Sequence, residues 1–348
     1  MGKRKTGAAR AKKALLITLC CVLAAVLTVL VIVTAVAGDL LGQIQRPSEM
    51  PTLSQEEIED ILNGDSTTGT GPNISEDEID FGGELTDVID SQKLINIMLI
   101  GQDTRADNAT RNSDAMILCT INKETKTLTM TSFLRDMYVQ IPGYGGNKIN
   151  ACYPIGGMKL LDKCLEQNFG VKVDANVAVN FNGFMKLIDM VGGVKINLTA
   201  DEANYLNYNG NWGVTGNDGW QLKAGENNLT GSQALAYSRI RALGLDFERT
   251  ERQRKVITSL LEKAKSMNVM ELYALAKEGV SMISTDMTDS EIWGYVTDLV
   301  PMLTDLKIVN QRIPVDGSYY FSDVGRIGDC IVLNFDVNRK FLADTLNP

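Results

Sequence analysis

The sequence contains no histidine in 348 residues. This absence excludes nucleophilic sites built on a Ser-His-Asp or Cys-His arrangement, and it excludes zinc sites with histidine ligands. We therefore expect any general base to be a carboxylate. Any metal ion is expected to be a hard cation held by oxygen atoms.

No CxxC motif occurs among the four cysteines that follow the N-terminal region, Cys119, Cys152, Cys164 and Cys330. Four cysteines allow three pairings, so the sequence alone does not assign them. A Cys152–Cys164 disulfide and four buried free thiols are both compatible with the spacing.

Charge is absent from residues 14–37, which are rich in leucine, valine, alanine and isoleucine. A helix of this length exceeds the hydrocarbon layer of a bilayer, which is about 30 Å thick. Residues 1–13 hold six basic residues and no acidic residue. We therefore predict a cytoplasmic stub over 1–13, a transmembrane helix over 14–37 and an extracytoplasmic remainder, as in a single-pass protein of the cell membrane. The alternative is a signal peptide cleaved after a small-residue site at 35–37, but the apolar run is longer than such peptides need.

Basic residues are scarce in the next segment, because residues 39–90 contain 14 acidic residues and one basic residue, Arg46. A segment of this composition buries too little apolar surface to offset the entropy lost on ordering. We predict an acidic extracytoplasmic stalk over 38–92. Within it, Ser54 is a candidate N-cap for a short helix over 56–63.

A strong net charge is missing from residues 91–348, which contain 27 basic and 29 acidic residues. A nucleic-acid partner is therefore not expected, since it would require a basic patch on a basic domain.

Strand and helix patterns alternate through the predicted folded domain, residues 93–348. Apolar runs predict buried strands, and a period near 3.6 residues predicts helices. The predicted strands are 94–101, 115–121, 127–133, 175–180, 194–198, 306–313 and 330–334, and the predicted helices are 156–169, 182–191, 231–240, 247–266, 269–282 and 290–303. Because most strands are apolar on both faces, we predict an α/β fold in which a central mixed β-sheet is covered by helices on both faces.

Two aspartates lie at the ends of predicted strands: Asp103 follows the first strand, and Asp114 precedes the second. If these strands are neighbours, both carboxylates lie at one edge of the sheet, where ligands gather. Two carboxylates, with water and phosphate oxygens, would suit Mg²⁺ or Mn²⁺. The alternative is structural, with Asp103 capping a turn and Asp114 pairing with Arg111.

Residues 237–254 contain five arginines. A guanidinium group matches phosphate oxygens two at a time. Arg239 and Arg241 precede a short loop, and Arg249 and Gln253 follow it, one helical turn apart on one face. This arrangement predicts a cup for a polyanion.

The other two arginines of this stretch have different predicted roles, because Arg252 is expected to be structural and Arg254 to lie in solvent. The alternative for the whole stretch is a solvated helix face, on which Glu248 and Glu251 pair with the arginines.

Further cationic side chains lie near strand ends and turns. Arg135 follows the predicted strand 127–133, and Lys148 follows a glycine-containing loop over 142–146. Both are candidates for the same anion site, as is Arg105.

An ordered set of motifs spans about residues 93–265. It consists of Gly101-x-Asp103-x-Arg105, Ser113-Asp114, Arg135-Asp136, Lys148-Ile149-Asn150-Ala151, Tyr237-x-Arg239-x-Arg241 and Asp246-Phe247-x-Arg249-x-x-Arg252-Gln253. The set resembles the LytR-CpsA-Psr family of bacterial cell-wall glycopolymer ligases.

The resemblance implies a membrane-anchored phosphotransferase over residues 93–348, with pyrophosphatase activity as a side reaction. It would move an anionic glycopolymer, of teichoic acid or capsular polysaccharide type, from polyprenyl pyrophosphate to peptidoglycan. A muramic-acid hydroxyl would attack the sugar phosphate, and polyprenyl phosphate would leave. The lipid tail would enter an apolar channel between the sheet and the helices.

The resemblance also implies residue roles. Asp103 and Asp114 would hold Mg²⁺ or Mn²⁺, and one of them would act as the general base. Arg135, Arg239 and Arg241 would bind the pyrophosphate and stabilise charge in the transition state. Asp246 would orient the arginines. Further pyrophosphate-binding positions would be Arg105, Arg111, Lys148, Arg249 and Gln253.

Two other functions are compatible with these residues. The first is a polyprenyl-pyrophosphate lipid binding protein without transferase activity, for which the aspartate pair would be dispensable. The second is a membrane-tethered transcriptional attenuator, which the short cytoplasmic stub and the acidic exterior disfavour.

Overall fold

The computed structural model describes residues 42–44, 46, 53–63, 72–85, 89, 93–102, 113–208 and 219–347. The chain divides into two units, residues 1–44 and 45–348, and all described helices and strands belong to the second. No helix among them is both long and apolar enough to span a membrane. The predicted stub and transmembrane helix, residues 1–37, lie outside the described residues.

A six-stranded mixed sheet forms the centre of the second unit, with the strand order β10-β7-β2-β3-β4-β11. β2 runs parallel to β7, β4 runs parallel to β11, and the other neighbouring pairs are antiparallel. The strands are β2 (Leu94–Gln102), β3 (Ser113–Asn122), β4 (Thr127–Phe133), β7 (Ala175–Asn180), β10 (Ile283–Thr285) and β11 (Lys307–Ile313). The predicted central mixed sheet is confirmed, and β4 and β7 have the predicted bounds.

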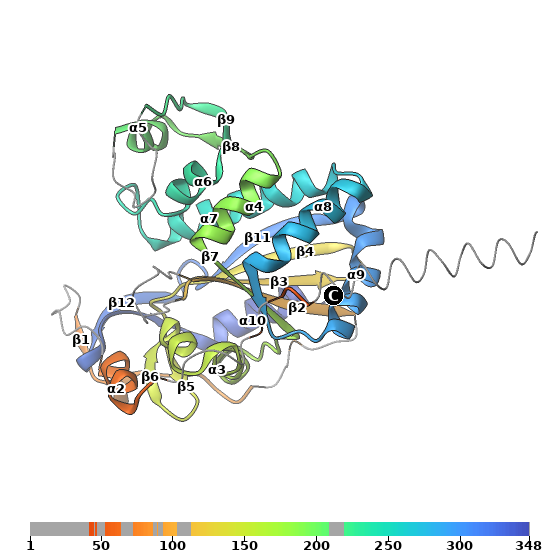
Figure 1. Ribbon diagram of the computed structural model, residues 1–348. Helices are drawn as coiled ribbons and strands as arrows, with labels where there is room; N and C mark the ends of the chain where they lie inside the picture. The colour runs from red at the N-terminus through yellow and green to blue at the C-terminus, as the bar shows by residue number, and fades with distance from the viewer. Residues whose placement is uncertain are drawn as a thin grey trace, which may run out of the picture. The chain divides into compact units, whose positions relative to one another are not determined.

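Helices cover both faces of this sheet (Figure 1). On one face, α3 (Cys152–Phe169) and α10 (Phe335–Leu346) bury side chains such as Leu161 and Leu342 in the largest core cluster. On the other face, α7 (Asp246–Lys265) and α9 (Asp289–Leu299) cover a second cluster that includes Ile117 and Met130. Both faces of the strands are apolar because both are covered, as predicted.

A separate lobe follows β7 in the chain. Its helices are α4 (Phe181–Met190), α5 (Ala200–Tyr208), α6 (Gly231–Ser238) and α8 (Val269–Gly279), and its strands are β8 (Val194–Leu198) and β9 (Gly225–Leu229). The strand predicted at 194–198 is therefore present, but it pairs with β9 outside the central sheet. Helices α4 and α6 approach closely at Gly231, where an added Cβ would collide with the carbonyl oxygen of Met185. Helix α6 ends next to Arg239, which is its C-cap residue, so this lobe carries that arginine.

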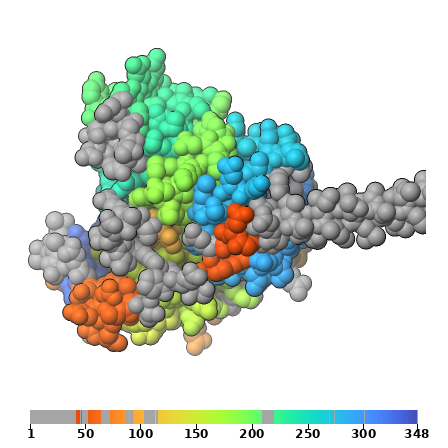
Figure 2. All heavy atoms as spheres, viewed as in Figure 1, coloured from red at the N-terminus to blue at the C-terminus, as the bar shows by residue number. Residues whose placement is uncertain are grey.

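Part of the predicted stalk is folded. Helix α2 (Gln55–Asn63) begins at the predicted cap, where the Glu57 amide donates to Ser54 Oγ at 3.2 Å. The Asn147 side-chain amide donates to the carbonyl oxygen of Leu62 at 3.0 Å, so this helix lies against the domain (Figure 2). The acidic composition concealed these contacts, because a few apolar side chains dock while the acidic ones remain in solvent.

A second docked part of the same segment comprises β1 (Asn73–Ile74) and the 3-10 turn Glu76–Glu78. β1 pairs in parallel with β12 (Tyr319–Val324), which pairs with β13 (Gly328–Leu333). Ile79 is 7 % exposed and Ile89 is 1 % exposed. The folded domain therefore begins well before residue 93, the boundary predicted from composition.

Several short elements were not predicted. They include the hairpin of β5 (Tyr138–Ile141) and β6 (Gly145–Lys148), the strands β9, β10 and β12, and the 3-10 turns Ile149–Ala151 and Gly325–Ile327. The helices α5 and α10 were not predicted either. The hairpin strands have four residues each, too few for a periodic pattern to stand out.

The four cysteines that follow the N-terminal region are buried free thiols. Of the two alternatives that the sequence left open, the structure therefore has the free thiols and not the Cys152–Cys164 disulfide. Cys152 and Cys164 lie on either side of a break in α3, where Gly156 and Gly157 depart from helical geometry. Burial raises the pKa of Cys119 to about 12, as expected for a thiol that packs as a small apolar side chain.

Candidate anion site at the carboxyl edge of the sheet

One edge of the central sheet gathers the ends of five strands. Gln102, the last residue of β2, pairs with Ser113 of β3 and with Asn180, the last residue of β7. Phe133, the last residue of β4, pairs with Met116 of β3 and with Ile313, the last residue of β11. Segments that leave these strands therefore begin at the same edge, which we call the carboxyl edge because four of the five strands end there.

Arg135 and Arg249 meet at this edge through Asp246. Arg249 donates from Nη2 to Asp246 Oδ2 at 2.8 Å, and Arg135 Nε lies 3.9 Å from the same oxygen. Arg135 Nε also lies 3.4 Å from Asp136 Oδ2. The Arg249 side chain is 3 % exposed and that of Arg135 is 21 % exposed, so the first is fixed within the protein while the second reaches solvent. Asp246 thus contacts both arginines, as an orienting residue would.

The start of α7 adds to the positive potential of this cluster. Asp246 is the first residue of a 20-residue helix, and Arg249 lies in its first turn. The unpaired amides at a helix N-terminus carry a partial positive charge that favours an anionic ligand. Gln253 lies one turn further along, and its Oε1 is buried without a hydrogen bond among the described residues.

Arg239 and Arg241 lie at the end of α6 in the lobe. The Arg239 guanidinium stands over the ring of Phe181, 4.7 Å from its centroid. Because Phe181 directly follows Asn180 at the end of β7, this contact places Arg239 at the carboxyl edge. Cation–π contacts of this kind fix a guanidinium without using its hydrogen-bond donors. Arg241 is exposed.

Lys148 reaches the same neighbourhood through its backbone. It pairs with Tyr138 in the β5–β6 hairpin, and the Asn150 amide donates to the carbonyl oxygen of Arg135 at 3.2 Å. Burial raises the pKa of Cys330 to about 12, and the positive charge of Lys148 opposes that rise, so the lysine and this thiol are close.

Of the two predicted metal ligands, only the backbone of Asp114 falls within the described residues. Asp103, Arg105 and Arg111 belong to residues 103–112, outside the described residues, and so does the side chain of Asp114. The register between β2 and β3 shifts after Gly101, which leaves Asp114 as the extra residue of a β-bulge. Bulges are frequent beside active sites. The backbone of Asp114 therefore lies at the carboxyl edge. The placement of Asp103 beside it stays a prediction.

One buried oxygen at this edge is of the kind that a hard cation binds. Ser113, beside Asp114, is fully buried, and its Oγ makes no hydrogen bond within the described part of the chain. Mg²⁺ and Mn²⁺ prefer oxygen ligands, and Asp103 and Asp114 stay the predicted carboxylate ligands. Among the described side chains alone, no group of three acidic or cysteine residues is close enough to hold a metal ion.

Arg252 is structural, as expected. It is 5 % exposed and donates from Nε to Glu202 Oε1 at 2.8 Å. Its other nitrogens donate to the carbonyl oxygens of Ile240 and Leu243, at 3.2 Å and 2.9 Å. The side chain therefore holds the loop between Arg241 and Asp246 in place.

The prediction that Arg254 lies in solvent is wrong. The residue is 6 % exposed and donates from Nη1 to Ser132 Oγ at 2.6 Å. Its neighbours on the same helix face, Ile257 and Leu261, pack on the sheet, so position 254 also faces the sheet. Burial, the larger effect, and the nearby charge of Arg312 lower the pKa of Arg254 to about 10, which leaves it charged at neutral pH.

Arg312 was missed in the sequence. It pairs with Ser132 at the carboxyl end of β11, and its guanidinium stands 4.4 Å from the ring centroid of Phe247. It also donates to Asp316 and to the carbonyl oxygen of Pro314. The sequence did contain a signal for Arg312, because it lies near the end of an apolar strand, as Arg135 does.

The sequence profile of the LytR_cpsA_psr family matches residues 62–327. The chain belongs to this family. Regulatory protein MsrR of Staphylococcus aureus (strain Mu50) is 32 % identical over 259 residues, which cover 73 % of this chain and 74 % of MsrR. A teichoic acid transferase of Enterococcus faecalis, TagU, is 32 % identical over 204 residues, or 57 % of this chain and 62 % of TagU.

Two solved structures of the family member TagT have the same fold. One is bound to LIIa-WTA and superposes with a TM-score of 0.60 at 26 % identity. The other holds octaprenyl pyrophosphate lipid and superposes with a TM-score of 0.56 at 25 % identity. Each match covers 78 % of this chain and 96 % of TagT.

Proposed function

We propose that the chain transfers an anionic glycopolymer from a polyprenyl pyrophosphate carrier to peptidoglycan at the outer face of a bacterial membrane. The observation that carries the proposal is the Arg135–Asp246–Arg249 cluster at the carboxyl edge, beside Arg239. The names of two relatives support it, since TagU is a teichoic acid transferase and TagT binds a pyrophosphate lipid.

The arginines suit the charge changes of this reaction. A sugar-phosphate phosphorus is attacked by an acceptor hydroxyl, the P–O bond to the bridging oxygen breaks, and polyprenyl phosphate leaves with that oxygen. The hydroxyl proton passes to a carboxylate, for which Asp103 and Asp114 are the candidates. Negative charge grows on the departing phosphate, where Arg135 and Arg239 would donate hydrogen bonds in fixed positions.

Asp103 and Asp114 would hold the divalent cation, which would neutralise charge on the pyrophosphate. The buried Ser113 Oγ, which makes no hydrogen bond within the described residues, supports such a site. Arg249 would retain its geometry through Asp246 whether or not the ion is present.

The lipid tail requires an apolar surface next to the arginines. On the sheet face covered by α7, the side chains of Ile97, Leu99, Ile257 and Leu261 are only partly buried. A tail that packed on them would remove this apolar surface from water. Residues 14–37 would anchor the chain in the same membrane that carries the lipid.

The test is transfer by the full chain in detergent, with a polyprenyl-pyrophosphate-linked saccharide, peptidoglycan and Mg²⁺ or Mn²⁺. Released polyprenyl phosphate and label on peptidoglycan are both measured. Asp114→Asn and Arg135→Ala are compared with Arg326→Ala, which removes an exposed arginine at the far end of the β12–β13 hairpin. We expect metal-dependent transfer that the first two variants lose and the third keeps.

Full turnover by Asp114→Asn and Arg135→Ala would refute the mechanism. Tight lipid binding without turnover, when a competent acceptor is present, would identify a binding protein instead.

A further inference from the structure

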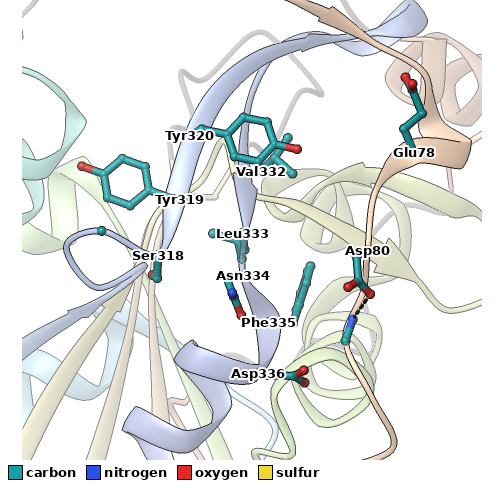
Figure 3. Close-up of a pocket in the computed structure, with 12 residues that line it drawn as sticks. Glu78, Asp80, Ser318, Tyr319, Tyr320, Val332, Leu333, Asn334, Phe335 and Asp336 are labelled. Carbon is teal, nitrogen blue, oxygen red and sulfur yellow. Dashed lines mark hydrogen bonds between the residues drawn. The ribbon is translucent and has the colours of Figure 1, made fainter.

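A pocket of about 370 Å³ lies between residues 78–82 and the β12–β13 hairpin (Figure 3). It is formed where the docked part of the predicted stalk faces the hairpin and the start of α10. Its lining residues include Glu78, Asp80, Tyr320, Val332, Phe335 and Asp336. None of them belongs to the arginine cluster.

Two aromatic residues line opposite parts of this pocket. The ring of Tyr320 lies beside Val332 at one end, and the ring of Phe335, which is 1 % exposed and part of the core, closes the other end near Asp80 (Figure 3). Tyr320 therefore supplies the open ring face. Tyr320 is 49 % exposed, an unusual state for a large ring on a strand that has a covered face. Aromatic rings offer flat apolar surfaces, and the C–H face of a sugar ring is an apolar surface of similar size.

Carboxylates supply hydrogen-bond acceptors between the rings. Asp80 Oδ1 accepts from the Gly82 amide at 2.9 Å, and Asp336 Oδ1 accepts from the Gly83 amide at 3.1 Å. The second oxygen of each carboxylate makes no hydrogen bond within the described part of the chain. Each carboxylate is thus held in place through one oxygen and has a second oxygen that can accept a hydrogen bond. Sugar hydroxyl groups can donate such bonds.

The charge of the pocket is opposite to that of the arginine cluster. Glu78, Asp80 and Asp336 line it, and no lysine or arginine does. The nearest paired cation is Arg339, whose Nη1 lies 3.5 Å from Asp336 Oδ1. Such a pocket repels phosphate groups, so it disfavours the polyanionic donor and accepts a neutral chain.

The pocket is joined to the anion site by a pair of rings. Tyr319, which also lines the pocket, has its ring centroid 5.0 Å from that of Phe247. Phe247 follows Asp246 in the first turn of α7 and lies under Arg312. A chain bound in the pocket would therefore extend over Tyr319 toward the arginines that hold the phosphate.

From these contacts we infer that the pocket is a subsite for the acceptor, and that it binds a neutral hexosamine residue of the peptidoglycan glycan strand. The inference rests on the proposed transfer function, because it assigns to that reaction the position of its second substrate. Donor and acceptor are thus separated by charge, with the phosphates at the carboxyl edge and the neutral glycan beside the acidic pocket.

The experiment measures binding of peptide-free peptidoglycan glycan strands to the full chain in detergent, without donor. Tyr320→Ala and Asp80→Asn are compared with Tyr144→Ala, a similarly exposed ring in the β5–β6 turn, and Asp77→Asn, an exposed acid outside the pocket. We expect Kd to rise about tenfold or more in the pocket variants, as when an interface anchor is truncated, and to be unchanged in the controls. Tyr320→Phe retains the ring and is expected to bind normally, which controls for folding. Polyprenyl pyrophosphate binding is expected to be the same in all five variants.

Three outcomes separate this inference from the proposed function. Equal glycan binding by all variants, or no glycan binding by a chain that transfers normally, would overturn the subsite. Binding that requires the stem peptide and is lost only in Asp80→Asn would also overturn it, because the ligand would then be a peptide amine. Glycan binding that depends on Tyr320 and Asp80, in a chain that transfers nothing, would support the subsite and refute the function.

Discussion

Charged side chains of opposite sign gather at the two ends of β7. The two clusters differ in how the repulsion between their like charges is reduced. At the carboxyl end, Arg135, Arg239 and Arg249 gather around Asp246 and Phe181. Toward the amino end, Asn176 donates from Nδ2 to Asp162 at 2.9 Å and to Asp286 at 2.8 Å. Burial, helped by the charges of Asp286 and Glu166, raises the pKa of Asp162 to about 7.

The difference lies in what each group can do with its charge. An aspartate close to other carboxylates can take up a proton and become neutral, so protonation lowers the repulsion within the amino-end cluster. A guanidinium group keeps its proton at any physiological pH, so the arginines need a counter-charge. Asp246 contacts both Arg135 and Arg249, and Asp136 is a second carboxylate beside Arg135. In the proposed function, the phosphates of the lipid would add further negative charge to this cluster.

The largest expected effect comes from an arginine that already has a buried counter-charge. Arg252→Ala leaves Glu202, 6 % exposed, without its partner. Breaking a buried pair in this way costs about 3–5 kcal/mol of stability. Denaturant unfolding of the variant should show this loss. Arg252→Ala combined with Glu202→Gln should recover a large part of it, and a double variant no more stable than the single one would contradict the ion-pair account.

Removing an arginine at the carboxyl edge should affect activity more than stability. Arg249→Ala deletes a donor that we propose binds the phosphates, while Asp246, 17 % exposed, remains in contact with water. Loss of one preorganised donor costs about 100- to 1,000-fold in turnover. Transfer kinetics and the unfolding midpoint are measured on the same preparation. A variant that loses several kcal/mol of stability but retains turnover would place Arg249 with Arg252 as a structural residue.

The amino-end cluster should instead respond to pH. Because the folded pKa of Asp162, about 7, lies above its ordinary value of 3.8, the folded protein holds a proton that the unfolded chain releases between those values. The free energy of unfolding therefore falls as pH rises from about 4 to 7. Asp162→Asn should raise stability at pH 8 by about 1 kcal/mol or more and flatten this dependence. An unchanged pH profile would show that Asp162 is ionised in the folded protein.

The smallest expected effect concerns the ring under Arg239. Phe181→Leu retains the apolar volume but removes the π face at 4.7 Å. A cation–π contact contributes about 0.5–1 kcal/mol, so affinity for polyprenyl pyrophosphate should fall a few-fold at most. Titration of the full chain with the lipid tests this. A loss of a hundredfold would mean that Phe181 contacts the ligand directly.

The sequence predicted the elements whose pattern is local and long. Apolar runs of this kind predicted β4 and β7. The local spacing of the arginines likewise predicted that Arg239 and Arg249 flank the loop before α7. Arg254 was misplaced because its burial depends on which face of α7 meets the sheet, which the stripe of Ile257 and Leu261 shows only after the sheet is placed. Arg312 was overlooked because its role depends on Phe247, 65 positions earlier in the chain.

The pocket lined by Tyr320 was beyond prediction for a related reason. Its walls come from residues 78–82 and from the β12–β13 hairpin, more than 200 residues apart. The first wall belongs to a segment whose acidity predicted a stalk, and the burial of Ile79 and the pairing of β1 with β12 show that it is docked.

The most direct test of the arginine cluster as a pyrophosphate site is a comparison of two ligands that share one lipid tail. The full chain is titrated with polyprenyl pyrophosphate and with polyprenyl monophosphate, alongside Arg135→Ala. We predict that the unsubstituted chain binds the pyrophosphate at least about tenfold more tightly, because the second phosphate meets additional guanidinium groups, and that Arg135→Ala loses most of this preference. Equal affinity for both lipids, in the unsubstituted chain and in the variant, would contradict the account.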